Sequence, residues 1–328
     1  MIYKLCILFI SSLLVTCTLS PICIKIGNKT GLIDRPEKRK INKRALVRIG
    51  GVCLFISSLA TFLIIIIQSK EISYPEIKHF FLISTIISFS AFFLGFADDV
   101  KSLNPLFRLF IQILIAISIW LNGIQILNID ISFLNTGIEY FELNKYLSLL
   151  ITVLWICGIT NAINWIDGLD GLASSIVGTG SLTFGLISLS MGHTIVSWIL
   201  IGLSGSCFGF LIFNTYPAKL IMGDGGSYFL GFNLGYLSIL GSTSISSLNN
   251  IEFPIQKLHI FIVIFAIPVL DMVFVICSRL LKKVSPFYPD NNHLHHRLIK
   301  AGFSHKKVVK ICIMSNIFVC TLSLLTFI

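Results

Sequence analysis

The chain has 328 residues, of which 55% are hydrophobic and 12% charged, and its formal net charge is +10. A soluble domain is about one quarter charged, so this composition excludes a water-soluble globular protein. Apolar runs of about 20 residues recur along the chain and are long enough to cross a bilayer. The composition therefore predicts a polytopic membrane protein, which we treat as a single domain over residues 1–328.

Ten apolar segments are expected to cross the membrane as helices, because a closed barrel would alternate polar and apolar residues. After the fourth segment, residues 123–146 do alternate and contain Asn-Thr-Gly, which predicts a short surface β-hairpin. The predicted fold class is an all-α polytopic membrane protein with about ten transmembrane helices and this one hairpin. The ten segments cover residues 3–24, 48–68, 79–97, 105–122, 147–164, 172–190, 194–213, 228–245, 258–281 and 308–327.

Lysine and arginine residues divide unevenly between the two sides that ten spans define. The loops and span ends within 25–48, 101–108 and 279–310, together with Lys219, hold 20 of the 25 basic residues. By the positive-inside rule this side is cytoplasmic, which places both termini and the hairpin outside. The basic charge is thus explained by topology, and no nucleic-acid partner is expected.

Five aspartates from three loops share the cytoplasmic side. Asp98 and Asp99 adjoin at the end of the third span, where two carboxylates are costly unless they are solvated, cation-bound or partly protonated. If the stretch NAINWIDGLDGLA begins the sixth helix, Asp167 and Asp170 lie one turn apart and face the same way. Asp224 follows in NTYPAKLIMGDGGS, whose glycines can expose amides to a phosphate. Taken singly, these motifs also fit a solvated helix end, a helix cap and a tight turn.

Three histidines cluster in SPFYPDNNHLHHRL, namely His293, His295 and His296, followed by Arg297. No cysteine is near, so phosphate binding or proton transfer is favoured over a transition-metal site. A solvated basic loop is the competing interpretation. Asp271 lies within a span, which indicates either a functional site or a structural pairing with a neighbouring helix.

Two further stretches extend this set. The amides of Asn161 and Asn164 suit recognition of a base, an amide or a phosphate. The basic stretch 34–44 fits contact with anionic lipid as well as a phosphate clamp. Acids suited to Mg²⁺, phosphate-binding loops and histidines at one membrane surface together predict phosphoryl transfer from a soluble anion to a membrane-bound acceptor.

The order FADDV, NAINWIDGLDGLA, NTYPAKLIMGDGGS, HLHHRL resembles the polyprenyl-phosphate N-acetylhexosamine-1-phosphate transferases of glycosyltransferase family 4. With the first inner loop, the resemblance covers nearly the whole chain, from Asp34 to Arg297. The resemblance implies ten or eleven helices, Mg²⁺ or Mn²⁺, a UDP-N-acetylhexosamine donor and a polyprenyl phosphate acceptor. It also implies a bacterial cytoplasmic membrane with the site on the cytoplasmic face, and it allows a homodimer.

The resemblance also implies roles for individual residues. Asp224 and Asp99 would hold the metal, Asp98 would be the base on the lipid phosphate, and the three histidines would hold the diphosphate. The other matching positions would line the nucleotide and substrate region: Asn161, Asn164, Asn214, Asp167, Asp170, Arg39, Lys40 and Arg297.

Two departures from the family pattern carry information. The pentapeptide branch of the family has three adjacent histidines, whereas this chain has His-Leu-His-His, which favours the branch that takes UDP-N-acetyl sugars such as UDP-GlcNAc. The first inner loop matches the family as far as Lys40. Asn42 then replaces the usual histidine and Val47-Arg48 the usual proline, which leaves the role of this loop open.

The expected reaction transfers N-acetylhexosamine-1-phosphate, with GlcNAc-1-phosphate preferred, to undecaprenyl phosphate and releases UMP, starting a cell-envelope glycan. One alternative is a phospho-MurNAc-pentapeptide transferase. The alternative from another class is a cation-coupled membrane transporter, whose acids should lie near the bilayer midplane on broken helices. Acids gathered at one face count against transport.

Overall fold

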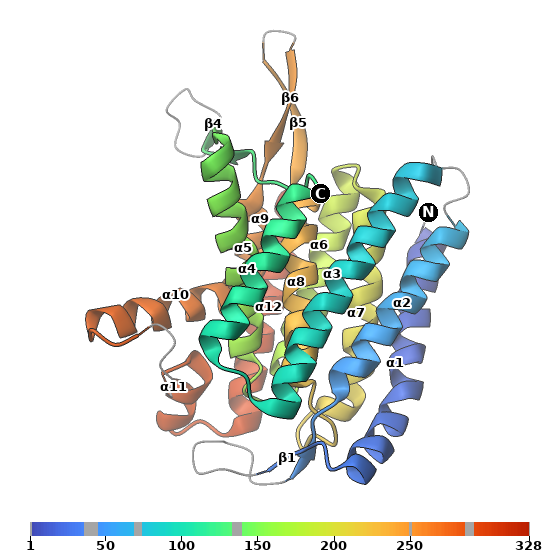
Figure 1. Ribbon diagram of the computed structural model, residues 1–328, viewed down its shortest axis with the longest axis vertical. Helices are drawn as coiled ribbons and strands as arrows, with labels where there is room; N and C mark the ends of the chain where they lie inside the picture. The colour runs from blue at the N-terminus through green and yellow to red at the C-terminus, as the bar shows by residue number, and fades with distance from the viewer. Residues whose placement is uncertain are drawn as a thin grey trace.

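The computed structural model describes residues 2–35, 45–68, 74–132, 140–248, 251–285 and 292–327. Long helices stand side by side in one bundle, with hairpins at one end and a short strand pair at the other (Figure 1). The helices are α1 (Ile2–Thr30), α2 (Gly50–Gln68), α3 (Tyr74–Lys101), α4 (Pro105–Leu121), α5 (Lys145–Ile166), α6 (Leu172–Ser190), α7 (Thr194–Asn214), α8 (Gly223–Gly241), α9 (Leu258–Ile264), α10 (Ala266–Leu281), α11 (Leu294–Lys300) and α12 (His305–Phe327).

Helices form at each of the ten predicted spans, which confirms the helical, polytopic part of the prediction. Within the described ranges, seven helices are long and apolar enough to cross a membrane, or eight if the bent pair α9–α10 counts as one span. Two of the ten predicted spans remain. Helix α4 is only 17 residues long, and α8 is not among the helices that are long and apolar enough to cross a membrane. The span count of ten stays a prediction.

The ninth predicted span, 258–281, is not one straight helix. It breaks at Phe265 into α9 and α10, which are bent by 89° relative to each other. Pro268 explains the break, because it has no N–H to donate to the carbonyl of Ile264 and its ring would clash there in a continuous helix. In Figure 1, α10 lies across the bundle instead of along it.

Helix α8 lies in the centre of the bundle, packed against α2, α3 and α5. Tyr228, Phe229, Phe232 and Tyr236 are each at most 2% exposed, so α8 is buried on all sides. Its polar Asn233 is satisfied, since the side-chain oxygen accepts from Ser88 Oγ at 2.9 Å. The N-terminus of this central helix carries Asp224, which is therefore placed in the middle of one end of the bundle.

Two antiparallel hairpins lie at the other end of the bundle. Strands β3 (Asn128–Asp130) and β4 (Tyr140–Glu142) pair between α4 and α5, which confirms the predicted hairpin, while its side of the membrane stays a prediction. Strands β5 (Thr243–Leu248) and β6 (Ile251–Gln256) form a second hairpin that the sequence analysis missed. Gln256 joins the two, because its Oε1 accepts from Leu127 N at 2.7 Å.

Both chain ends lie toward the hairpin end of the bundle (Figure 1). This agrees with the expectation that the termini share one side. At the opposite end, β1 (Ile33–Asp34) and β2 (Leu46–Val47) pair, and Val47 also bridges to Leu220 just before α8. The loop before α2 is thereby fixed next to the loop that carries Asp224.

Candidate active site

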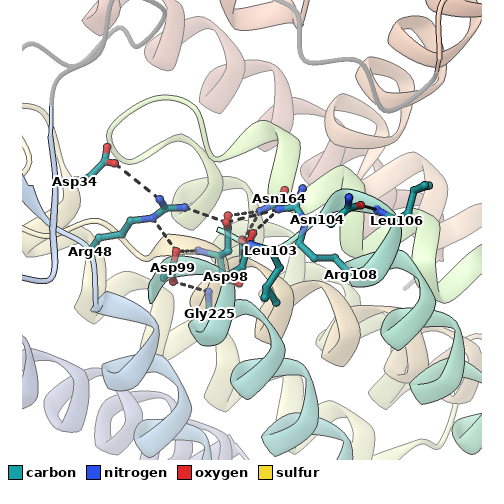
Figure 2. Close-up of polar contacts among 12 residues, drawn as sticks. Asp34, Arg48, Asp98, Asp99, Leu103, Asn104, Leu106, Arg108, Asn164 and Gly225 are labelled. Carbon is teal, nitrogen blue, oxygen red and sulfur yellow. Dashed lines mark hydrogen bonds and ion pairs between the residues drawn. The ribbon is translucent and has the colours of Figure 1, made fainter. Parts of the chain in front are cut away.

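Charged side chains from three helices and one loop meet in one cluster (Figure 2), at the end of the bundle away from the termini (Figure 1). We call this set the acid–arginine cluster; it consists of Asp34, Arg48, Asp98, Asp99, Arg108 and Asp224. Two of its acids end α3, Asp224 begins α8, Arg108 lies on α4 and Arg48 precedes α2. The structure therefore brings Asp98, Asp99 and Asp224 together, as the sequence predicted.

Arg48 is the centre of this cluster. Its Nε lies 2.7 Å from Asp99 Oδ1, one terminal nitrogen lies 2.9 Å from Asp224 Oδ2, and the other lies 3.8 Å from Asp34 Oδ1. Burial disfavours the charged guanidinium, but the surrounding carboxylates outweigh burial and raise the pKa of Arg48. Arg48 is thus a fixed positive charge among the acids.

The two adjacent acids of α3 have different partners. Asp98 pairs with Arg108 through an ion pair and accepts from Leu103 N at 2.6 Å. Asp99 accepts from the backbone amides of Asp224 and Gly225 at 2.8 and 2.9 Å. A carboxylate is favoured at a helix N-terminus, so Asp99 also fixes the start of α8 against the end of α3.

A glycine permits this close approach of α3 and α8. A Cβ atom added at Gly95 would overlap the backbone carbonyl of Asp224. Because backbone cannot move aside as the end of a flexible side chain can, the two helices reach this distance only with glycine at position 95.

Residues at the C-terminus of α5 also contact the acid–arginine cluster. Asn164 Nδ2 donates to Asp224 Oδ1 and to Ser227 Oγ, both at 2.8 Å. Asp167 ends the helix, and burial and the charge of Asp224 raise its pKa well above the usual value, although Arg48 opposes the shift. Asn164 and Asp167 therefore join the acids, whereas Asn161 donates to Gln112 of α4.

Asp167 and Asp170 do not share a helix face, so that expectation was wrong. Helix α6 begins at Leu172, and Gly171 with φ +78° separates it from the turn that carries both acids. The Asp170 side chain contacts the loop between α7 and α8, where its Oδ2 accepts from Ala218 N at 3.0 Å. A turn that needs a positive φ replaces the expected helical turn.

Asn214 forms part of the frame of this turn. Its Oδ1 accepts from Gly171 N at 3.1 Å and from Ser174 Oγ at 2.8 Å, and its Nδ2 donates to Leu220 O at 2.9 Å. The side chain is buried and joins the end of α7 to α6 and to the loop before α8. Its predicted contact with nucleotide stays a prediction.

The histidines form a second group, which we call the histidine cluster: Asp271, His293, His295, His296 and Arg297. Asp271 of α10 is 4% exposed; its Oδ2 lies 3.0 Å from His293 Nδ1 and its Oδ1 accepts from Leu294 N at 2.6 Å. Asp271 is thus paired with the histidine loop, because the break at Phe265 turns α10 toward it. Arg297 lies 3.8 Å from the same carboxylate.

His295 connects the histidine cluster to the aspartate turn. A Cβ atom at Gly168 would overlap the His295 ring, so the imidazole lies directly against residues 167–171. Burial and the neighbouring histidines lower the pKa of His295 to about 3. The ring is therefore neutral at physiological pH.

The acid–arginine cluster fits a divalent cation by its charge. Its four carboxylates outnumber its two guanidinium groups, which leaves a negative charge. Within the described part of the chain, no three His, Cys, Asp or Glu side chains form a group that could hold a metal by themselves. Mg²⁺ usually binds one or two carboxylates and completes its shell with water and substrate phosphates, so two carboxylates such as those of Asp224 and Asp99 could contribute to such a site.

The sequence analysis missed Arg48 and Arg108 as site residues. The sequence assigns Arg108 only to the basic inner loops, and Arg48 also to a departure from the family motif, because an arginine beside a span end is what topology alone predicts. The replacement of the usual proline by Val47-Arg48 was the available signal. Arg39 and Lys40 lie outside the described residues.

The fold and the site together define a helical membrane protein with a charged site at one end of its bundle. The glycosyl transferase family 4 pattern matches residues 80–242. A Bacillus subtilis (strain 168) protein named "Probable undecaprenyl-phosphate N-acetylglucosaminyl 1-phosphate transferase" is 36% identical over 306 residues, covering 93% of this chain and 80% of that protein. The chain therefore belongs to glycosyl transferase family 4.

Two further relatives are similar over most of their length. The decaprenyl-phosphate N-acetylglucosaminephosphotransferase of Mycobacterium tuberculosis (strain CDC 1551 / Oshkosh) is 27% identical, covering 87% of this chain and 73% of the relative. The phospho-N-acetylmuramoyl-pentapeptide-transferase of Desulforudis audaxviator (strain MP104C) is 28% identical, covering 90% of each.

Proposed function

We propose that this protein transfers N-acetylhexosamine-1-phosphate, with GlcNAc-1-phosphate preferred, from a UDP-sugar to polyprenyl phosphate. The observation that carries the proposal is the acid–arginine cluster at the bundle end of a family 4 chain. The 36% identity to a protein named for the GlcNAc reaction supports the sugar.

In the proposed reaction, an oxygen of the lipid phosphate attacks the β-phosphorus of the UDP-sugar. A new P–O bond forms, the bond from that phosphorus to the bridging oxygen breaks, and UMP leaves with the electron pair. The product is a polyprenyl-diphosphate-linked sugar. Because charge moves from the attacking to the leaving oxygen, the protein needs mainly to position the two phosphates and to neutralise charge.

Asp224 and Asp99 would hold the cation, which supplies positive charge to the diphosphate when it is bound. Asp98 is held between Arg108 and the amide of Leu103, so its carboxylate is fixed in direction. A phosphate monoester has a second pKa of about 6, so most of the lipid phosphate has already lost its second proton at neutral pH. Asp98 therefore needs only to orient the lipid phosphate or to accept its last proton.

The histidine cluster would hold the diphosphate of the donor. Asp271 fixes the direction of His293 through Nδ1, which leaves Nε2 for a ligand. Arg297 adds a permanent positive charge beside it. Asn164 and Asp167 would face the donor nucleotide, and Arg39 and Lys40 belong to the proposal through the sequence motif alone.

We infer that the site faces the cytoplasm, because 20 of the 25 basic residues lie on that side of the predicted topology. Alkaline phosphatase fused after residue 328 should then be active in cells, and green fluorescent protein at the same position should be dark. The reverse pattern would overturn the orientation.

The deciding experiment uses purified protein, Mg²⁺, polyprenyl phosphate and UDP-GlcNAc labelled in the sugar. Label that enters the lipid phase together with an equal amount of UMP supports the proposal, and UDP-GalNAc and UDP-MurNAc-pentapeptide in parallel define the donor. Failure to transfer from any of these donors, with intact UDP-sugar carried across vesicles, would establish a transporter instead.

A further inference from the structure

Arg48 occupies the two carboxylates that would hold the cation. Its Nε donates to Asp99 Oδ1 at 2.7 Å (Figure 2), and one terminal guanidinium nitrogen donates to Asp224 Oδ2 at 2.9 Å. The other oxygens are also engaged, Asp224 Oδ1 by Asn164 and Asp99 Oδ2 by the amide of Gly225. A cation that binds here must therefore compete with groups already present.

These competing groups differ in how easily they can move. The amide of Gly225 belongs to the backbone of α8, and Asn164 is held by a second hydrogen bond to Ser227. The Arg48 side chain is 29% exposed, so it has room to move toward solvent. Arg48 is thus the partner that a cation can displace at the smallest cost.

The backbone at Arg48 remains fixed even if the side chain moves. Val47 O accepts from Ile221 N at 2.9 Å, and the amides of Gly50 and Gly51 donate to the carbonyls of Ile221 and Met222 at 3.0 and 2.9 Å. The segment 47–51 therefore lies along the strand-like stretch that leads to Asp224. This pairing keeps the guanidinium within reach of both carboxylates.

We propose that Arg48 is a positioning residue that acts as a built-in counter-ion: it holds Asp99 and Asp224 together in the cation-free enzyme and is displaced from Asp224 when a divalent cation binds. Without it, the carboxylates would repel each other across the start of α8. Arg48 therefore lowers the affinity for the cation while it preserves the geometry of the site. This inference rests on the proposed function, because it takes Asp224 and Asp99 as the cation donors.

The test measures Mn²⁺ binding to purified cation-free protein in detergent by electron paramagnetic resonance, without substrates. Arg48→Met should lower the Kd for Mn²⁺ by about tenfold, because it removes a positive charge in contact with both donors. Arg48→Lys, which keeps the charge but cannot bridge both carboxylates, should fall between Arg48→Met and the wild type. Lys101→Met removes one charge at an exposed position of the same end and should change the Kd by less than twofold.

Thermal unfolding in EDTA and in Mn²⁺ distinguishes the proposed role of Arg48 from a purely structural one. In EDTA, Arg48→Met should have a lower Tm than the wild type, and saturating Mn²⁺ should restore much of that loss. A structural role alone would lower the Tm equally in EDTA and in Mn²⁺. Equal or weaker Mn²⁺ binding by Arg48→Met would overturn the proposal.

The two proposals can fail separately. An active transferase that binds Mn²⁺ through Asp224, shown by loss of binding in Asp224→Asn, but whose Kd is unchanged in Arg48→Met, would overturn the Arg48 proposal alone. A protein that binds no Mn²⁺ would overturn it as well, and the transfer assay would then decide the function independently.

Discussion

The acid–arginine cluster and the histidine cluster lie on either side of the turn 167–171, but they are held together in different ways. The first draws its members from the loop before α2 and from α3, α4 and α8, and opposite charges join residues 176 positions apart. The second comes from one short segment, residues 293–297, and depends on one buried carboxylate, Asp271. The first is distributed, and the second has a single anchor.

This difference predicts how each cluster responds to substitution. In the acid–arginine cluster Asp98, Asp99 and Asp224 each have more than one partner, so loss of one charge leaves the shape in place and alters the electrostatics. In the histidine cluster the loss of Asp271 releases His293 and the start of α11 together. The predictions below test this contrast, from the largest expected effect to the smallest.

Asp224→Asn should have the largest effect. The amide keeps the size of the side chain but removes the negative charge that would hold the cation, so transfer should fall by about a thousandfold or more. The Tm should change little, because the amide oxygen can still accept from either Asn164 or Arg48, and the loss of the other hydrogen bond is offset by relief of the repulsion between Asp224 and the neighbouring acids. Asp130→Asn, at a buried aspartate of the hairpin end, is the matched control and should retain activity. Near-normal turnover in Asp224→Asn would remove the assignment of the metal to this residue.

The contrast between the clusters also explains what could be predicted from sequence. Asp98, Asp99 and Asp224 were placed at one end correctly, because charge and hydropathy assign each loop to a side of the membrane. Their pairing with Arg48 and Arg108 could not be predicted, because long-range ion pairs depend on how helices pack. A basic residue in an inner loop also has an ordinary explanation in topology.

Two other misses have specific causes. The break at Phe265 was overlooked because the hydropathy of 258–281 is continuous, although Pro268 gave a local signal for it. The β5–β6 hairpin was missed because the eighth predicted span, 228–245, included the first residues of β5, whose sequence TSISSL is rich in serine and lacks the aromatic residues typical of strands. Hydropathy identifies buried segments well, but it does not indicate where such a segment bends or changes to strand.

Gly95→Ala should disrupt the acid–arginine cluster by geometry instead of charge. The added Cβ would overlap the carbonyl of Asp224, so α3 and α8 must separate and the hydrogen bonds from the α8 amides to Asp99 must lengthen. We expect about a hundredfold loss of transfer and a lower Tm, since a displacement near 1 Å is enough to cost that much. Gly158→Ala is the control, because its Cβ would meet Met272 only at 3.7 Å. Equal behaviour of the two variants would contradict the close-approach argument.

Asp271→Asn should release the histidine cluster. Asparagine can still accept from Leu294 N, but it no longer holds the charge that fixes the tautomer of His293. Removing such an outer partner typically costs about 10- to 100-fold in activity, and we expect a fall in kcat within that range. His293→Gln should lower kcat similarly, and the double variant should be little worse than either single one. Additive losses in the double variant would show that Asp271 does not act through His293.

Asp167→Asn should raise stability while it lowers activity. Burial and the charge of Asp224 raise the pKa of Asp167, so its ionisation opposes folding, and this cost appears as the pH rises above the ordinary pKa near 3.8. At neutral pH the neutral amide removes that cost, and the Tm in EDTA should increase by a few degrees. Transfer should fall by about tenfold, since the site loses one acid. A lower Tm in the variant would indicate that Asp167 is stabilising.

His295→Gln tests whether the imidazole of His295 is neutral, and it should have the smallest effect on stability at pH 7.5. The folded-state pKa of about 3 lies below the ordinary value of 6.5, so the unfolded chain takes up a proton first as the pH falls. The stability that depends on neutral His295 is complete above pH 6.5 and is lost progressively between 6.5 and 3. From pH 7.5 to 5 the wild type should lose about 2 kcal/mol more stability than His295→Gln, at about 1.4 kcal/mol per pH unit below 6.5. Thermal unfolding of both proteins across this range measures the difference, and parallel pH profiles would mean that the pKa of His295 is the same in the folded and the unfolded protein.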